Sequence, residues 1–291
     1  MISDATETPG SCKRSPLCCK LMADTMELNH DLIDLEWGDE GVVPETIHPD
    51  TMFIFTKMGQ IIIDMAAARD GDIVLDVGCG RGIDILTLAK RGAKAIGIDP
   101  SGKMMAGARE HLGRNKKQID GRGDAVLVRG IGEALPFKRR SLDRIICKGS
   151  LDHFADIERT MSDMSGSLKS DGIAIIAVAN FDSLACRLGR WWFPIIKRLR
   201  HAKGERHPWQ PPADHNYRFD CAMVKKTVKN DFEIKRMRGM SLLWTAPYWG
   251  KTLSVIPKWA SSAILKLLDW GARLFPSLSD VIIVKLAPKV S

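Results

Sequence analysis

The stretch "VLDVGCGRG", residues 74–82, is an apolar run that leads into an acid and then three glycines at alternate positions. A short apolar run before glycines is typical of a buried parallel strand, and a helical pattern follows it. Gly78 and Gly80 can adopt positive φ and have no Cβ that would block a ligand. The helix that begins near Gly82 offers unpaired N–H groups in its first turn. The stretch therefore predicts a strand–turn–helix unit whose backbone closely approaches a ligand.

The spacing of the glycines and acids indicates which ligand this turn holds. A dinucleotide turn reads G-x-G-x-x-G, whereas here the third glycine comes one residue earlier. Asp76 precedes the turn, where a carboxylate would oppose a pyrophosphate but would attract an ammonium group. Asp99 ends the next predicted strand, where a carboxylate can accept hydrogen bonds from both ribose hydroxyls. The pair of acids therefore favours a nucleoside joined to an amino acid over NAD.

Strand and helix patterns alternate on both sides of this turn. Strands are predicted at residues 72–77, 94–99, 125–130, 141–148, 171–180, 232–238 and 280–288, and helices at 82–92, 101–114 and 156–169. This order predicts an α/β fold with a Rossmann-like, mostly parallel, seven-stranded sheet and helices on both faces. An N-terminal helical segment, clearest at residues 52–68, and a C-terminal helical insertion are expected to complete it.

The chain is expected to divide into four parts. Residues 1–25 resemble a flexible tail, 26–70 form the N-terminal helical segment, and 71–180 form the cofactor-binding core. Residues 181–291 form an acceptor-side lid and supply the last two strands. Seven of the eight tryptophans lie after residue 190, which sets this last part apart in composition.

Composition and charge limit the function classes. No run reaches the roughly 18 uncharged apolar residues that span a membrane, and no secretory signal is expected near the N-terminus. The seven cysteines are scattered without a C-x-x-C pair, which favours free thiols and a cytoplasmic location. Residues 1–50 carry eleven acids and three bases, yet the whole chain has a net charge of +8. The basic remainder suits an anionic partner or simply a soluble surface.

Four motifs in order carry a family resemblance: "VLDVGCGRG", then "GIDPS", "GEALPF" and "SLDRIICKGSLDHF". Over roughly residues 50–180 the chain resembles the class I S-adenosylmethionine-dependent methyltransferases, and within them the branch that includes quinone C-methylating enzymes. The resemblance implies S-adenosylmethionine as cofactor and methyl transfer by direct displacement. It assigns the methionine part to Asp76, Gly78, Cys79, Gly80, Gly82, Cys147 and Lys148, the ribose to Asp99, and the adenine surroundings to Pro100, Ser101 and Met104.

The chain departs from the family pattern in "RGIGEALPF". The family usually has an aspartate after the first glycine, which bonds the adenine amino group, and here that residue is Ile131. The backbone N–H of Gly132 can still meet the ring, and Glu133 is a candidate substitute. Weaker cofactor binding is one expected consequence of this change.

Candidate residues for the acceptor side follow the fourth strand. The first candidate for a base or an acceptor-positioning group is His153, with Asp152 to orient it; packing at the start of the next helix is the alternative. The proline-rich stretch 207–220 is predicted to be an extended loop that caps the pocket and contributes His207, His215 and Tyr217. Trp191 and Trp192 are further acceptor-side candidates. No metal site is predicted, because no cysteine or carboxylate cluster accompanies His207 and His215, and the cysteines at 12, 18 and 19 match no common ligand spacing.

The C-terminal insertion contains a predicted amphipathic helix at residues 257–275, with proline at its start. Its expected polar side is Lys258, Ser262, Lys266, Asp269 and Arg273, and its expected apolar side is Ile264, Leu267, Leu268, Gly271, Leu274 and Phe275. Packing on its own domain is one interpretation. Contact with a lipid-like acceptor or the inner membrane surface is the other, because tryptophan and lysine beside an apolar face suit an interface.

Three functions stay open on the sequence alone. The leading one is methyl transfer to a small-molecule or lipid-like acceptor. An RNA methyltransferase is the second, suggested by the basic runs at 114–117, 138–140 and 197–200, although no RNA-binding module accompanies them and a nucleic-acid partner is not favoured. The third is a non-catalytic cofactor-binding module, suggested by Ile131. The oligomeric state cannot be predicted from these patterns.

Overall fold

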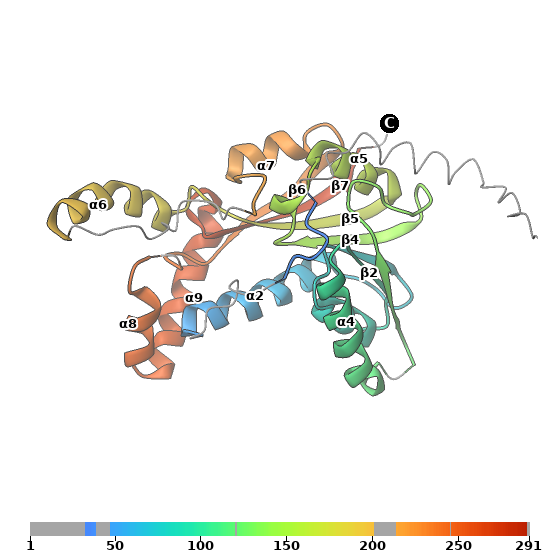
Figure 1. Cartoon of the computed structure of the whole chain (residues 1–291), viewed down its shortest axis with the longest axis horizontal. Helices are drawn as coiled ribbons and strands as arrows, with labels where there is room; N and C mark the ends of the chain where they lie inside the picture. The colour runs from blue at the N-terminus through green and yellow to red at the C-terminus, as the bar shows by residue number, and fades with distance from the viewer. Residues whose placement is uncertain (1–32, 39–46, 120, 201–213, 245, 290–291) are drawn as a thin grey trace, which may run out of the picture.

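The structure is a computed structural model that describes residues 33–38, 47–119, 121–200, 214–244 and 246–289, with the side chains of 193–200 excepted (Figure 1). The predicted tail at 1–25, and with it the cysteines at 12, 18 and 19, lies outside the described residues, as does His207.

A seven-stranded sheet in the order β3-β2-β1-β4-β5-β7-β6 forms the centre of the fold. Its strands are β1 Ile73–Val77, β2 Lys94–Asp99, β3 Asp124–Arg129, β4 Leu142–Lys148, β5 Leu168–Ala179, β6 Phe232–Met240 and β7 Val281–Pro288. The first five strands pair in parallel, and β7 lies antiparallel between β5 and β6. The predicted α/β fold with a mostly parallel, seven-stranded sheet is therefore confirmed.

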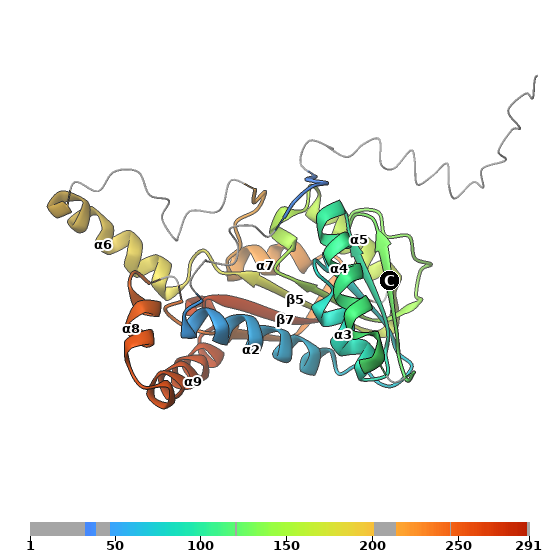
Figure 2. The ribbon, with the colours of Figure 1, turned by 60° about the horizontal axis from the view of Figure 1, so that its bottom comes forward.

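Helices cover both faces of the sheet, because its central strands are apolar on both sides (Figure 2). One face carries α5 Ile157–Ser167 and α7 Cys221–Val228, and the other carries α2 Pro49–Ala66 and α3 Ile83–Lys90, with α4 Gly102–Asn115 beside α3. The remaining helices are α6 Leu184–Arg200, α8 Trp249–Val255 and α9 Lys258–Leu274, and the short 3-10 turns are η2 Lys116–Gln118, η3 Leu151–His153 and η4 Pro276–Leu278.

The carboxyl ends of β1, β2 and β4 define the edge where the site lies. The sheet order places β1 between β2 and β4, so the strand order reverses at this point. In open α/β sheets a crevice forms outside the carboxyl ends of the strands where the order reverses. Asp76, Asp99 and Lys148 lie at or near the ends of these strands.

The C-terminal insertion is helical, as expected, and the face that α9 buries is not the apolar side that the sequence pattern gives it. Helix α9 buries Ser261, Leu265, Asp269 and Ala272, whereas Leu267 and Leu274 are exposed. Asp269 can be buried because Arg238 of β6 and Arg273 pair with its carboxylate. The partner on β6 is distant in sequence, so the helical pattern alone put Asp269 on the solvent side.

None of the described helices is both long enough and apolar enough to cross a lipid bilayer. The cysteines within the described residues, Cys79, Cys147, Cys186 and Cys221, are free thiols, in line with the sequence expectation.

Candidate active site

The turn after β1 has the strained backbone that its glycines predict. Gly78, Gly80 and Gly82 have φ of 73°, 51° and 70°, in the left-handed region that side chains disfavour. The N–H groups of Gly78 and Cys79 donate to the carbonyl of Ile98, at 2.9 and 3.1 Å, and tie the turn to β2. A Cβ on Gly78 would lie 2.4 Å from the side chain of Ser150, so any residue other than glycine would clash at this position.

The two acids that the sequence singled out flank this turn. Asp76 is 2% exposed, and its Oδ1 atom has no hydrogen-bond partner. Burial, together with the nearby Asp84 carboxylate, raises the pKa of Asp76 well above its usual value, and Lys148 offsets this only in part. A buried carboxylate oxygen without a hydrogen-bond partner is typical of a site that binds a cationic group or a hydrogen-bond donor.

Asp99 is held by the backbone of the same turn. Its Oδ2 accepts from the N–H of Gly80 at 2.9 Å, and its Oδ1 accepts from the N–H of Ser101 at 2.9 Å. Burial raises the pKa of Asp99, and these two hydrogen bonds oppose the shift. Each carboxylate oxygen keeps a second lone pair, so the fixed carboxylate can still accept from two neighbouring hydroxyls.

Helix α4 begins beside Asp99 and is capped by Ser101. The Ser101 side chain accepts from the N–H of Met104 at 3.2 Å, which satisfies one donor of the first turn. Its hydroxyl also donates to the carbonyl of Trp37, and Gly102 donates to the carbonyl of Leu35. Residues 33–38 are thereby fixed along the start of α4, next to the turn.

The adenine region differs in part from the expectation. Ile131 and Gly132 lie in the wall of the cavity, and a Cβ on Gly132 would come within 3.0 Å of the Phe154 ring. The Glu133 carboxylate is buried and accepts from the N–H of Ala155 at 2.7 Å. One oxygen of Glu133 is therefore engaged by the chain itself, and its role as a substitute adenine contact stays a prediction.

Lys148, at the end of β4, lines the same cavity as the glycine turn. It forms an ion pair with Asp84 at the start of α3, and both lie next to Gly59 of α2. Cys147 is fully buried behind it, and burial raises the pKa of this thiol to about 12. Lys148 is thus a cavity residue whose charge is already paired, whereas Cys147 is a packing residue.

A cavity of about 770 Å³ joins these parts. This volume lies in the range of pockets that enclose small molecules and cofactors. The predicted cofactor residues line it with the exception of Asp76, Gly82 and Cys147, which are not among its lining residues. The glycine turn, the buried acids and the cavity together fit a nucleoside that carries an ammonium group.

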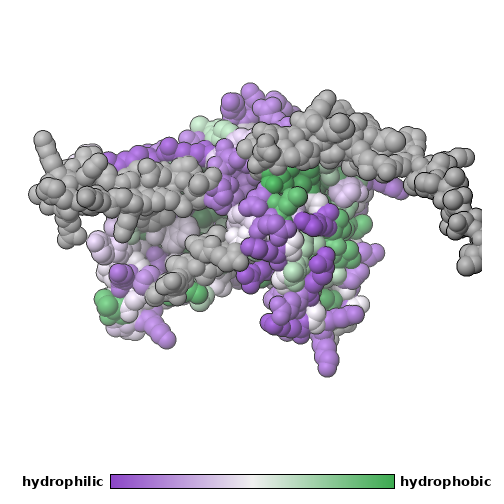
Figure 3. All heavy atoms as spheres, in the orientation of Figure 1, coloured by the Kyte–Doolittle hydropathy of each residue, from purple (hydrophilic) through white to green (hydrophobic). Residues whose placement is uncertain are grey.

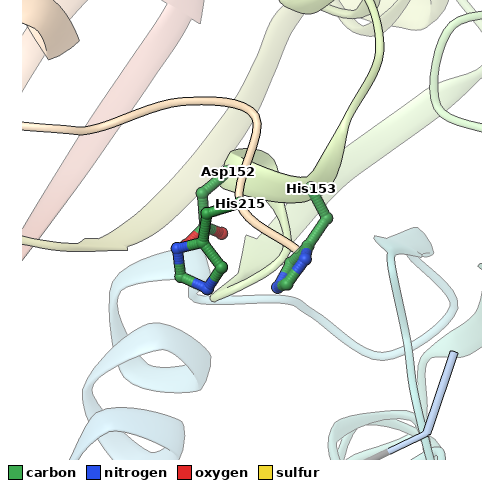
Figure 4. A group of neighbouring side chains, drawn as sticks. All are labelled: Asp152, His153 and His215. Atoms are coloured by element: carbon green, nitrogen blue, oxygen red, sulfur yellow. The ribbon is translucent and has the colours of Figure 1, made fainter. Parts of the chain in front are cut away.

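A second group lies where η3 meets the segment before α7 (Figure 4). Asp152, His153 and His215 each offer a nitrogen or oxygen atom within 4.8 Å of the others. The Nδ1 atom of His215 lies 2.8 Å from Oδ2 of Asp152, so Asp152 contacts His215 rather than His153. His153 lines the cavity, and its Nδ1 lies 3.0 Å from the carbonyl oxygen of Asp214.

The other acceptor-side candidates lie elsewhere. Tyr217 donates its hydroxyl to the carbonyl of Ala155 at 3.2 Å and does not line the cavity. Trp191 and Trp192 lie on α6 with 65% and 51% of their surface exposed, outside the cavity wall. The stretch 214–220 is an irregular segment, as the sequence predicted for this part of the loop.

Two cavity residues, Trp37 and Asp214, were not predicted from the sequence. Trp37 donates its indole N–H to Oδ2 of Asp214 at 3.0 Å, and its ring lies 5.2 Å from that of His153. Burial opposes ionisation of Asp214, but this hydrogen bond and the neighbouring histidines lower its pKa overall. Trp37 is the one tryptophan before residue 190, and this isolation in an acidic stretch was the available signal.

Comparison with known proteins identifies the class. Residues 75–176 match the family model described as "Methyltransferase domain", which spans β1 to β5 and includes the turn and both acids. A ubiquinone biosynthesis O-methyltransferase of Nitrosomonas europaea is 35% identical over 160 residues, which cover 54% of this chain and 64% of that protein. Residues 75–176 therefore match a methyltransferase domain, in agreement with the resemblance to the class I S-adenosylmethionine-dependent methyltransferases.

Solved structures share the fold at low sequence identity. Geranyl diphosphate C-methyltransferase of Streptomyces coelicolor superimposes with a TM-score of 0.52 at 13% identity, over 94% of this chain and 99% of that one. The [4+2]-cyclase SpnF superimposes with a TM-score of 0.55 at 16% identity, over 94% and 96%. The matches to the curated relatives span 39–64% of those proteins' lengths. A shared fold does not by itself define the reaction, as the cyclase illustrates.

Proposed function

We propose that the chain transfers a methyl group from S-adenosylmethionine to a small-molecule or lipid-like acceptor. The observation that carries this proposal is the pair of buried acids, Asp76 and Asp99, on either side of the strained glycine turn. The methyltransferase-domain match over residues 75–176 supports it, as does the similarity to a ubiquinone biosynthesis O-methyltransferase. Residues 71–180 would form the cofactor core, and residues 181–291 the acceptor side.

S-adenosylmethionine supplies an activated methyl group on a sulfonium, and displacement of that group is governed by alignment. Asp99 would accept from the ribose hydroxyls, since Gly80 and Ser101 hold its carboxylate fixed. Asp76 would attract the ammonium group through its unpaired carboxylate at the methionine end. Ser101 and Met104 would pack at the adenine end, where the Ile131 side chain supplies an apolar contact in place of an acid.

His153 is proposed as the side chain that meets the acceptor. It lies on the cavity wall with Ser150 and Phe154, and residues of α2 also line the cavity. The Asp214 carbonyl and the Trp37 ring fix its orientation. A group in this position can align a nucleophile for the transfer.

The proposal is tested by incubating the purified protein with methyl-labelled S-adenosylmethionine and extracts of the source cells. Label is expected in the organic or small-molecule fraction, and only with active protein. The Asp99→Ala variant serves as the negative control. Label confined to RNA would favour the RNA methyltransferase, whereas absence of transfer to every fraction would contradict the proposed activity.

We propose in addition that α8 and α9 rest on a membrane surface that holds the acceptor. Exposed apolar side chains gather there beside bases: Val255, Trp259, Leu267, Trp270 and Leu274, with Lys251, Lys258 and Lys266. Hydrophobic surface is visible beside hydrophilic surface at this end of the molecule in Figure 3. Tryptophan and lysine on one helix suit the interface of an anionic bilayer.

We expect the protein to sediment with vesicles that contain phosphatidylglycerol and less with phosphatidylcholine alone. The Trp259→Ser/Trp270→Ser double variant should bind at least about tenfold more weakly, because each exposed indole loses an apolar contact worth about 1 kcal/mol. Val126→Ser removes an exposed apolar side chain on β3 and should bind normally. Equal vesicle binding by the double variant would rule out this surface.

A further inference from the structure

We propose that Asp152, His153 and His215 bind a divalent transition-metal ion that faces the cavity and holds an oxygen atom of the acceptor. The contact with the acceptor rests on the proposed function, whereas metal binding by these residues does not. The three side chains come from two segments, η3 and the stretch before α7, and they point toward a common space (Figure 4).

The distances suit metal ligands. One ligand atom from each residue lies within 4.8 Å of the other two. Bond lengths of about 2.0–2.2 Å place the ligand atoms of a tetrahedral zinc site roughly 3.3–3.6 Å apart. Side-chain rotations that move these atoms by about an ångström would therefore close the group around an ion, without movement of the backbone.

Two polar atoms of this group are buried without a hydrogen-bond partner, and a bound ion would supply the missing partner. Asp152 is 4% exposed, and its Oδ1 atom has no hydrogen-bond partner. The Nδ1 atom of His215 also lacks one, although it lies only 2.8 Å from Oδ2 of Asp152. The two side chains face each other at ion-pair distance, and a bound ion would replace this contact and also satisfy the buried Oδ1 of Asp152, which is costly to leave unpaired.

The surroundings orient the two imidazoles. A carbonyl oxygen can only accept, so the 3.0 Å contact with Asp214 places the proton of His153 on Nδ1 and leaves Nε2 free to bind an ion. Such a hydrogen bond behind a ligand histidine is the usual support of metal sites. The His215 ring packs edge-on against the rings of His153 and Phe181, with centroids 4.6 and 5.8 Å away.

The backbone fixes the two segments to each other. The carbonyl of Asp152 accepts from the N–H groups of Asn216 and Tyr217, at 2.7 and 3.2 Å. The Asn216 side chain donates to the carbonyls of His153 and Phe154, at 3.0 and 3.1 Å. The ligand set is thus preorganised by bonds that do not use the ligand atoms.

The donor set indicates the kind of ion and its use. Two imidazoles and one carboxylate suit Zn²⁺, Fe²⁺, Mn²⁺ or Co²⁺ with open positions, rather than Mg²⁺ or Ca²⁺, which prefer oxygen. Since His153 lines the cavity, an open position would face the acceptor. A bound hydroxyl loses its proton to water more readily, because the ion stabilises the oxyanion. The acceptor oxygen then takes the methyl group as the carbon–sulfur bond breaks, and that bond's electron pair stays on sulfur. The acceptor class is a phenol, alcohol or enol.

The test is metal binding by the full chain after removal of metal with a chelator. The wild-type protein should bind one equivalent of Zn²⁺ in calorimetry, and Co²⁺ should give visible absorption bands. His215→Ala, His153→Ala and Asp152→Asn should each weaken Zn²⁺ binding by at least about 100-fold, because one of three ligands is lost. His215→Gln serves as a second variant if the alanine form does not fold.

Two controls locate the site. His48→Ala removes a histidine outside the cavity wall, and a Cys12→Ser/Cys18→Ser/Cys19→Ser variant removes the N-terminal thiols; both should bind Zn²⁺ normally. Failure of the wild-type protein to bind Zn²⁺ or Co²⁺, or normal binding by the folded His215 and Asp152 variants, would overturn the proposal.

Acetohydroxamate, an oxygen ligand for metal ions, tests the contact with the acceptor. It should shift the Co²⁺ absorption bands of the wild-type protein, and unchanged bands would overturn this half. S-adenosylmethionine binding is measured on the same samples. Metal binding without cofactor binding would refute the proposed function and leave the metal site standing. Cofactor binding without metal binding would refute the metal site and leave the proposed function standing.

Discussion

The Asp99→Ala variant is expected to bind S-adenosylmethionine at least about 100-fold more weakly than the wild-type protein. The buried carboxylate would accept two hydrogen bonds from the ribose, and a hydrogen bond to a charged group contributes about 1.5–3 kcal/mol. Loss of both corresponds to a factor of about 10²–10⁴ in the dissociation constant. Calorimetric titration measures this difference directly.

Two further variants separate binding from folding. Asp99→Asn keeps the shape of the side chain and one acceptor oxygen for the backbone of the turn, so it should lose less affinity than alanine. Asp124→Ala removes an exposed acid at the start of β3 and should bind the cofactor normally. Wild-type affinity in a folded Asp99→Ala protein would mean that the ribose is held elsewhere.

The Gly78→Ala variant is expected to lower the free energy of unfolding by about 2–5 kcal/mol. The new methyl group would sit at φ 73° and 2.4 Å from the Ser150 side chain. Left-handed strain costs about 1–2 kcal/mol and overpacking a further 1–3 kcal/mol. Ser150 cannot yield freely, because its hydroxyl donates to the carbonyl of Val77 at 3.0 Å. Urea denaturation monitored by circular dichroism gives the value.

Gly71→Ala is the matched control for Gly78→Ala. Gly71 has φ 80°, but nothing lies within 4 Å of the position that its Cβ would take, so this variant should show only the backbone strain. A Ser150→Gly replacement made together with Gly78→Ala should recover part of the loss. Equal costs for the two alanine variants would show that close packing at Gly78 is unimportant.

The sequence predicted those parts of the site that depend on neighbours along the chain. The turn at 78–82 and the acids at the ends of β1 and β2 follow from local patterns, because strand ends and glycine spacing are local properties. Their meeting at one edge follows from the parallel order of the strands, which the alternation of strand and helix already indicated.

The remainder depends on contacts between distant segments. Trp37 meets Asp214 across 177 positions, and His215 meets Asp152 across 63, so neither pairing leaves a local pattern. The burial of Asp269 in α9 leaves no local pattern for the same reason, since Arg238 reaches its carboxylate from β6. Trp191 and Trp192 were predicted to face the acceptor because the C-terminal part is rich in tryptophan. They do not line the cavity, because their position depends on the direction of α6, which composition does not determine.

The most direct test is a calorimetric titration of the purified wild-type protein with S-adenosylmethionine, with NAD⁺ titrated in parallel. Asp76 and Asp99 beside the glycine turn predict binding of one equivalent of S-adenosylmethionine and much weaker binding of NAD⁺, whose pyrophosphate the Asp76 carboxylate would oppose. Absence of S-adenosylmethionine binding, or tighter binding of NAD⁺, would contradict the assignment of this cavity.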